Sequence, residues 1–277
     1  EGNIGLAKAI PDRRFRASWA SARCDRSLFY RLTGVADSDP NTLADYWRFG
    51  IGSMVHEKLQ ECMPDLFPGV RVEVPVDLLP IGLDGSATVD MIIPQKDGGL
   101  TVVEIKTING FGFKKAATSF KGPVEGPRWS AVVQGALAAA ALKANLIIAY
   151  LSLENLSPGV ALSYGDGTTV GQFGAEWHFS ADQATEIATA EVARINNVLR
   201  QADDGIKPAR EIHDPEAPTG AVVQDPNHAK GNGSWLLRID DAVLDSGTTW
   251  MCAYCNHRQQ CSIDGEGGST MTVDPGF

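Results

Sequence analysis

Residues 85–107 constrain the fold more than any other stretch of this chain. Two runs rich in apolar and β-branched residues, 87–93 and 100–107, flank the segment 94–99. That segment contains Asp-Gly-Gly, and such residues tolerate the positive φ that a tight turn requires. The stretch therefore predicts a β-hairpin around which the rest of the chain is organised.

Three charged side chains interrupt the apolar pattern of this hairpin. Asp90 lies in the first strand, and Glu104 and Lys106 project to the same side of the second strand because side chains repeat every two residues. Burying such groups is costly unless they are paired. Two interpretations follow from these residues alone: a structural Lys–Glu pair beside a solvated Asp, or a functional site.

The composition limits the class of protein. The chain has 277 residues, 43% of them hydrophobic, which allows one large domain or two small ones. A net charge of −10 argues against indiscriminate coating of nucleic acid, but it allows a local basic groove beside an acidic site. No apolar run is long enough to cross a membrane, and the chain begins without a secretion-like segment, so we expect a cytoplasmic protein without a membrane partner.

The rest of the chain predicts strands that alternate with helices. Helices are expected from Thr42 to residue 59 or 62, with a break near Gly50 and Gly52, and at 129–143 and 181–202. Strands are expected at 70–76 and 146–153 and, at the edges of a sheet, at 159–164 and 176–179. A mobile loop is expected at 114–128, with Lys114 and Lys115, and an irregular insertion at 211–233. This order indicates an α/β or α+β fold with a mixed sheet.

Two polar residues of the predicted helices have both a structural and a functional interpretation. His56 is a lone helical histidine, a residue that usually makes a structural hydrogen bond, unless the fold brings it to Asp90. Gln134 is the one polar side chain in the middle of an alanine-rich helix, and its amide needs partners. Those partners lie either on another helix or in a functional site.

Arginines and aromatic residues alternate in the first thirty-odd residues, which include Arg23, Arg26, Arg31, Phe29 and Tyr30. Such a stretch can follow a phosphate backbone and stack bases. It can equally form the outer face of a helix that its aromatic residues pack against the protein. The sequence leaves both interpretations open.

Three of the five cysteines are clustered near the end of the chain. Cys252, Cys255 and Cys261 follow the spacing C-x2-C-x5-C, which suits one metal centre that needs a fourth ligand. That ligand is either His257 or a distant cysteine, and Cys24 is the candidate. A zinc site usually has two close pairs, so three plus one favours an iron–sulfur cluster. Cys62 is expected to be an inert, partly buried thiol.

Taken in order, these residues resemble a known family. His56, Asp90, Glu104-x-Lys106 and Gln134 resemble the motifs of the RecB-type PD-(D/E)XK nucleases, and the enclosing cysteines are similar to those of the iron–sulfur branch of that family. The resemblance implies a restriction-endonuclease-like core, a mixed central sheet flanked by helices, whose terminal segments are joined by a [4Fe–4S] cluster on Cys24, Cys252, Cys255 and Cys261. It implies a single nuclease domain, 1–277, with segments 1–40, 41–204 and 205–277.

The resemblance also implies an activity and the residues that perform it. The expected protein is a metal-dependent DNA exonuclease that acts 5′-to-3′ on single-stranded DNA or free ends. Mg²⁺ or Mn²⁺ would be held by His56, Asp90, Glu104 and the carbonyl of Ile105, which suit such ions. Lys106 would orient or help deprotonate the attacking water, and Gln134 would hold Lys106 or the substrate. Family members often have Tyr four residues after this Gln; here Ala138 stands there, which puts the orientation of the substrate in doubt.

Two alternatives remain open. The chain is either a catalytically silent DNA-binding subunit of a recombination or CRISPR-adaptation complex, or a zinc-bound interaction protein on the same fold. The intact Asp90, Glu104 and Lys106 argue against the first, and the spacing of the cysteines argues against the second. The chain has no G-x4-G-K-[S/T] motif, so unwinding would need a helicase partner. Self-association into a homo-oligomer is also open.

Overall fold

The protein is seen in a computed structural model, which describes residues 14–117, 125–153, 169–170, 174–209, 221–224, 235–239, 242–244, 255–264 and 269–270. The chain divides into two compact units. Unit 1 comprises Glu1–Phe15, Ala22–Pro40 and Ile195–Phe277, and unit 2 comprises Arg16–Ser21 and Asn41–Arg194. The predicted core, 41–204, begins at the same residue as the long segment of unit 2, Asn41–Arg194, and ends ten residues after it. That the whole chain works as a single domain stays a prediction.

The predicted hairpin is confirmed in unit 2. Strands β3 (Gly85–Pro94) and β4 (Leu100–Ile108) are antiparallel, with Met91 opposite Val103. In the turn the backbone N–H of Gln95 donates to the carbonyl of Gly99 at 2.8 Å, and Gly98 has a φ of 87°. The Asp-Gly-Gly sequence thus meets the conformational requirement that it predicts.

The hairpin forms the middle of a mixed sheet. Strand β2 (Arg71–Asp77) is antiparallel to β3, whereas β5 (Asn145–Ser152) is parallel to β4. Among the described residues the order is β1-β3-β4-β5-β7-β6, with β2 also on β3. The remaining strands are β1 (Phe15–Arg16), β6 (Thr169–Val170) and β7 (Gly174–Phe179). The mixed α/β architecture that the sequence predicts is confirmed.

One predicted edge strand is placed differently. Residues 176–179 belong to β7, which pairs with β5 on one side and with β6 on the other, so β7 is not an edge strand. The short strand β6, which the sequence analysis missed, covers it at Glu176 and Ala175. The predicted strand 159–164 lies outside the described residues.

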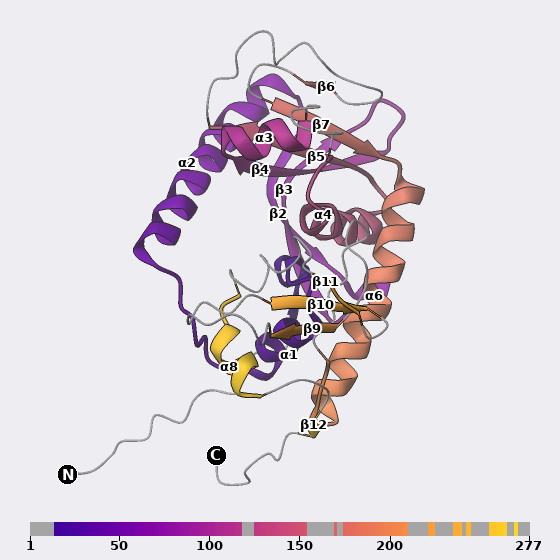
Figure 1. The fold of residues 1–277 in the computed structure, drawn as a ribbon. Coiled ribbons are helices and arrows are strands. Elements are labelled where there is room, and N and C mark those ends of the chain that lie inside the picture. The colour runs from indigo at the N-terminus through magenta and orange to yellow at the C-terminus, as the bar shows by residue number, and fades with distance from the viewer. Residues whose placement is uncertain are drawn as a thin grey trace, which may run out of the picture. The chain divides into compact units, whose positions relative to one another are not determined.

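Helices α2 (Leu43–Leu66) and α4 (Trp129–Leu142) lie on opposite sides of this sheet (Figure 1). On one side Met91, Val103 and Ile105 form a buried cluster against which Leu59 and Met63 of α2 pack. On the other side Gly135 of α4 lies against Leu146 and Ile148 of β5. Alternating residues of β4 and β5 therefore face different helices, as the period of a strand requires.

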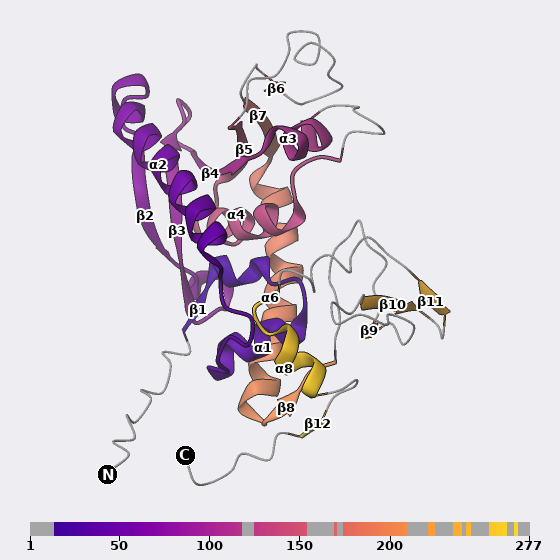
Figure 2. The ribbon, with the colours of Figure 1, turned by 60° about the vertical axis from the view of Figure 1, so that its left-hand side comes forward.

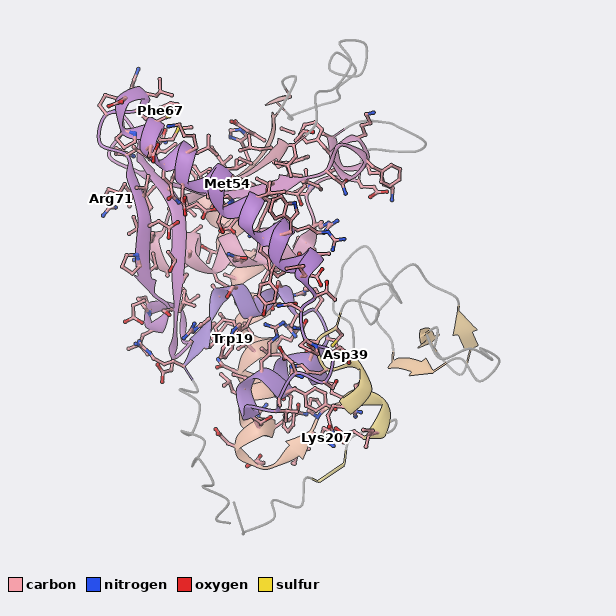
Figure 3. The ribbon with its side chains drawn as sticks, turned by 90° about the vertical axis from the view of Figure 1, so that its left-hand side faces the viewer. Trp19, Asp39, Met54, Phe67, Arg71 and Lys207 are labelled. Carbon is pink, nitrogen blue, oxygen red and sulfur yellow. The ribbon has the colours of Figure 1, made fainter. Side chains whose placement is uncertain are left out.

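Helix α2 is longer than expected and is continuous. Thr42 and Asp45 form a capping box, and the helix continues to Leu66 without the predicted break. Gly52 is needed for contact rather than for a break, because a Cβ there would lie 3.3 Å from Oγ1 of Thr107 in β4. No residue of α2 is fully buried, and Figure 3 shows this helix in front of the sheet, with Met54, 62% exposed, near its middle.

The prediction of a mobile loop at 114–128 is wrong for its first part. Lys114 and Lys115 lie in a helix, α3 (Gly110–Ala117), which buries Phe113, Ala116 and Ala117. Three apolar residues on one face stabilise this helix in spite of its two glycines, which lower helix propensity. Residues 118–124 lie outside the description.

Unit 1 collects segments from both ends of the chain. Its elements are α1 (Asp25–Thr33), the end of α6 (Ala181–Asp203), β8 (Ile206–Lys207), β9 (Ala221–Gln224), β10 (Trp235–Ile239), β11 (Ala242–Leu244), α8 (Arg258–Ile263) and β12 (Ser269–Thr270). Figure 2 shows α8 beside α1. Strand β9 contradicts the irregular structure predicted at 211–233, because it pairs with β10; the other residues of that stretch lie outside the description.

Two arginines of the N-terminal stretch are placed unlike either interpretation. Arg23 and Arg26 are buried, and Nε of Arg26 donates to the carbonyl of Pro208 at 2.8 Å. They therefore neither follow a phosphate backbone nor lie on the outer face of a helix. Phe29 and Tyr30 are core residues of α1.

Two short 3-10 helices, η1 (Ala17–Ser21) and η2 (Leu79–Ile81), complete the described elements of unit 2. Helix α4 is apolar but has only 14 residues, fewer than the roughly 20 that a span needs. No described helix is both long enough and apolar enough to pass through a membrane.

The close contact of α4 with the sheet gives a test of the packing. A Cβ at Gly135 would lie 2.6 Å from Cδ1 of Leu146 and 3.3 Å from Cβ of Glu104. We therefore expect Gly135→Ala to lower the free energy of unfolding by about 1–3 kcal/mol, although alanine favours the helix. The matched control is Gly50→Ala, where no atom lies within 4 Å and stability should rise by up to about 1 kcal/mol. Urea denaturation measures both; equal stability of Gly135→Ala and the wild type would contradict the packing.

Candidate functional site

The site lies at the end of the regular backbone pairing between β3 and β4. The regular register ends at Met91 opposite Val103, so the next facing pair is Asp90 and Glu104. There the backbone N–H of Ile105 donates to Oδ2 of Asp90 at 2.7 Å. At this point the Asp90 side chain, rather than a backbone carbonyl, accepts the N–H of β4. This hydrogen bond holds the carboxylate of β3 against the backbone of β4. The Asp90 side chain is only 14% exposed, so the predicted alternative of a solvated Asp is wrong.

Glu104 and Lys106 lie on the α4 side of the sheet. Nζ of Lys106 is 2.6 Å from Oε1 of Glu104, whose side chain is 4% exposed. Nζ also donates to Oε1 of Gln134 in α4 at 3.2 Å. The fold thus brings together the three polar residues that the sequence singled out on β4 and on the alanine-rich helix. A Lys–Glu pair is present, as the structural interpretation expects. In addition, Asp90 lies near Glu104, and the amide of Gln134 accepts a hydrogen bond from Lys106.

His56 joins the group from α2. Its Nδ1 lies 3.4 Å from Oδ1 of Asp90. The close approach of Gly52 to Thr107, one turn earlier, brings this part of α2 against β4. The condition under which His56 is more than a structural histidine, its contact with Asp90, is therefore met. Its role as a metal ligand stays a prediction.

The charges of this group act on one another. The pKa of Glu104 is raised to about 7, mainly by burial; Lys106 lowers it, and Asp90 raises it. Burial lowers the pKa of Lys106, but Glu104 more than offsets this, so that pKa is raised. The hydrogen bond to Asp90 raises the pKa of His56 against the effect of burial. The two carboxylates are therefore close enough for the charge of Asp90 to act on Glu104, and the Lys106 ammonium and the His56 ring lie beside them.

The chemistry of these donors fits a hard divalent cation. Two carboxylates that disfavour each other's charge would be stabilised by a cation, and Mg²⁺ and Mn²⁺ prefer oxygen ligands. As the side chains stand, however, no three His, Cys, Asp or Glu residues within the described ranges come together closely enough to hold a metal ion. The ligand set of His56, Asp90, Glu104 and Ile105 stays a prediction.

Sequence reasoning missed Tyr150 at this site. Tyr150 of β5 is paired with Lys106 of β4 in the parallel register, and only 1% of its surface is exposed. The alternation of buried residues in the strand gives its face, but only the pairing of β5 with β4 places it beside Lys106. That pairing joins segments forty-odd residues apart and has no local signal in the sequence.

Apart from Cys62, the described cysteines lie in unit 1. Cys24 directly precedes α1, Cys255 precedes α8, and Cys261 lies in α8. Burial raises the pKa of Cys24 to about 12; the N–H groups of Ser27 and Arg26 partly offset this, and Cys261 and Cys255 add to it. Cys255 and Cys261 therefore lie within electrostatic range of Cys24, although the three described sulfurs do not form a metal-binding group as they stand. Cys252 lies outside the described residues, and the cluster itself stays a prediction.

His257, the other candidate for the fourth ligand, is buried in unit 1, and neither of its ring nitrogens has a hydrogen-bond partner among the described residues. His257 is 1% exposed, and its ring packs edge-to-face on Tyr30 with the centroids 5.2 Å apart. Its Nε2 lies 3.6 Å from Oδ1 of Asp37. Burial lowers its pKa, whereas Asp37 raises it and Arg31 lowers it. Cys62, which we expected to be partly buried, is exposed on α2.

Backbone contacts hold together the two segments that carry the cysteines of unit 1. The N–H of Asp39 donates to the carbonyl of Asn256 at 2.8 Å, and the N–H of Gln260 donates to Oγ of Ser38 at 3.2 Å. The hydroxyl of Tyr30 donates to Asp264 at 2.5 Å. The protein itself therefore joins the first and last segments of unit 1.

The chain is similar to a few solved structures. One is the crystal structure of LHK-Exo in complex with dAMP, with 16% sequence identity, 69% of this chain and 90% of that chain covered, and a TM-score of 0.43. Another is the crystal structure of SSO0001, with 14% identity, 68% and 79% covered, and a TM-score of 0.36. No protein-family model and no curated protein matches the chain. Similarities this weak establish no family.

The raised pKa of Glu104 predicts how stability depends on pH without metal. Between its ordinary value of 4.5 and about 7, the folded state binds more protons than the unfolded state, so stability falls as pH rises. Glu104→Gln should remove most of this fall. His56, whose pKa is also raised, adds a further fall above pH 6.5.

Denaturation of the metal-free protein from pH 4.5 to 7 measures this, with Glu57→Gln on exposed α2 surface as the control. A wild type and a Glu104→Gln variant with the same dependence on pH would show that Glu104 ionises normally.

Proposed function

We propose that the protein is a metal-dependent nuclease that hydrolyses phosphodiester bonds of DNA. The observation that carries this proposal is the convergence of His56, Asp90, Glu104 and Lys106 from α2, β3 and β4. These groups are mostly withdrawn from solvent. The pKa of Glu104 is raised chiefly by burial, and those of His56 and Lys106 are raised by their carboxylate neighbours. Shifted pKa values grouped in this way are typical of sites that bind a cation or perform proton transfer.

Four groups of the chain would hold Mg²⁺ or Mn²⁺. They are the carboxylates of Asp90 and Glu104, the carbonyl of Ile105 and the imidazole of His56, whose nitrogen suits Mn²⁺ better than Mg²⁺. When bound, such an ion supplies a polarised water and neutralises charge at the phosphate. The hydrogen bond from the N–H of Ile105 fixes the Asp90 carboxylate against β4. Two of the four ligand groups, this carboxylate and the carbonyl of Ile105, are thereby held close together.

Lys106 is the group that would act on the reacting atoms. The Lys106 side chain is 36% exposed, whereas the Glu104 side chain is 4% exposed, so Lys106 is accessible to a substrate while its ammonium is held by Glu104. An ammonium in this position orients an attacking water and stabilises the charge that develops on the phosphate. Gln134 accepts a hydrogen bond from the same ammonium and limits its freedom.

The finer description of the activity rests on the resemblance of the motifs. By that resemblance the substrate is single-stranded DNA with a free end, degraded 5′-to-3′ by an exonuclease of the PD-(D/E)XK type. The same resemblance assigns a structural [4Fe–4S] cluster to Cys24, Cys252, Cys255 and Cys261. The placement of Cys255 and Cys261 within electrostatic range of Cys24 supports this assignment. The resemblance also suggests the partner to test for, which is a helicase or another recombination or CRISPR-adaptation protein.

The first prediction for the activity concerns the metal ligand and the ammonium. Asp90→Ala and Lys106→Ala should each lower the rate of cleavage by about 100-fold or more, because each removes a group that stabilises the transition state. The assay is digestion of end-labelled single-stranded and duplex DNA with Mg²⁺ or Mn²⁺ under anaerobic conditions, which reports substrate and polarity as well.

Matched controls exist for both changes. Asp97→Ala alters an aspartate of the hairpin turn, and Lys58→Ala alters an exposed lysine of α2; both should cleave like the wild type. Full activity of Asp90→Ala or Lys106→Ala would overturn the mechanism. A wild type that binds DNA without cleaving it would instead indicate the silent DNA-binding subunit.

The second prediction concerns the cluster. Cys24→Ala and Cys255→Ala should each lose iron, visible absorbance and thermal stability, because a cluster that only the folded chain binds stabilises the fold. Cys62→Ala is the control, since Cys62 is an exposed residue of α2 in unit 2. Iron content and melting temperature of anaerobically purified protein decide. Zinc in place of iron would favour the interaction protein, and an iron-loaded Cys24→Ala would show that Cys24 is not a ligand.

A further inference from the structure

Tyr150 borders the proposed site from β5. It is paired with Lys106 of the neighbouring parallel strand, so the two side chains project to the same face of the sheet. This is the face of α4, because Ile148, two residues earlier on β5, lies against Gly135 of that helix. The ring of Tyr150 packs edge-to-face on Trp177 of β7, with the centroids 5.0 Å apart. Packing therefore fixes where its phenol oxygen lies.

The phenol oxygen holds the first residue of α4. It accepts the backbone N–H of Arg128 at 2.7 Å. Arg128 is the N-cap, and its carbonyl accepts the first hydrogen bonds of the helix, from Ala131 at 2.9 Å and from Val132 at 3.2 Å. Its own side chain makes no capping hydrogen bond. Arginine is not among the favoured N-cap residues, so Tyr150 fixes a helix end that lacks a side-chain cap.

The position of α4 matters because Gln134 lies on it. Gln134 follows Arg128 by six residues, about 9 Å along a helix axis, and its Oε1 accepts from Lys106 at 3.2 Å. Alanine and glycine fill most of the buried face of α4, among them Gly135, Ala136, Ala138 and Ala139. These small side chains let the helix approach the sheet closely, as at Gly135, but apolar contacts of this kind are not directional. A hydrogen bond at the end of the helix is a more specific restraint.

We propose that Tyr150 is a positioning residue of the nuclease site, which holds α4 so that Gln134 meets the ammonium of Lys106. This inference rests on the proposed function for its effect on cleavage, but its structural part does not. Tyr150 acts through Gln134 and not on the substrate. The losses caused by Tyr150→Phe and by Gln134→Ala must therefore overlap.

Kinetics of Tyr150→Phe, Gln134→Ala and the double variant test this directly. Tyr150→Phe keeps the ring against Trp177 and removes only the oxygen. We expect it to lower kcat by about 10- to 100-fold, with KM for DNA little changed, because a small displacement of a positioning group has effects of that size. In the Gln134→Ala background the same change should cause almost no further loss, since residues in one network are not additive. Tyr46→Phe, which alters an exposed tyrosine of α2, should behave like the wild type.

Hydrogen exchange separates this inference from the proposed function. Amides of residues 128–134 should exchange faster in Tyr150→Phe than in the wild type or in Tyr46→Phe, whether or not the protein cleaves DNA. Unchanged exchange in this segment would overturn the role of Tyr150. Wild-type cleavage by Tyr150→Phe would overturn it as well, and so would losses that add in the double variant. An inactive wild type with the expected exchange would overturn the proposed function alone.

Discussion

The hydrogen bond from the N–H of Ile105 to the carboxylate of Asp90 is the interaction on which the site depends. At 2.7 Å it joins β3 to β4 one residue beyond their regular register. It places a carboxylate opposite Glu104. His56 contacts this carboxylate, and Lys106 contacts Glu104 and Gln134. An apolar residue at position 90 would leave that N–H without this acceptor and Glu104 without its acidic neighbour. The same bond therefore serves the sheet and assembles the site.

The fold supports this arrangement by using small residues where two elements must approach closely. Gly52 lets α2 come to Thr107, and Gly135 lets α4 come to Leu146 and Glu104. Each of the two helices contributes one polar residue to the site: His56 contacts Asp90, and Gln134 contacts Lys106. The cost of burying Glu104 appears as its pKa of about 7, which a bound cation would lower.

Local patterns predicted the long helices and the longer strands of the main sheet, and long-range pairing explains much of what they missed. The turn at Gly98, the cap at Thr42 and the group around Asp90 follow from turn chemistry, capping and strand period, which a sequence displays directly. Tyr150 and the inner position of β7 depend on which strands become neighbours, and no local pattern carries that information. The burial of Arg26 has the same origin, because its partner, Pro208, is 182 residues away. The helix at Lys114 was missed because glycine and lysine obscure its short apolar face.

The most direct test of the central claim is the binding of Mn²⁺ at about pH 6, followed through the resonance of free Mn²⁺ and through the protons released. A metal ligand must be deprotonated, so binding to Asp90 and Glu104 should be saturable and should release a proton from Glu104, whose pKa is about 7. Asp90→Ala should abolish the binding, and Glu104→Gln should lower the proton release to the share that His56 contributes as a ligand, because the pKa of His56 is also raised. Absence of saturable binding, or equal binding by wild type and Asp90→Ala, would show that these carboxylates form a structural group and hold no metal.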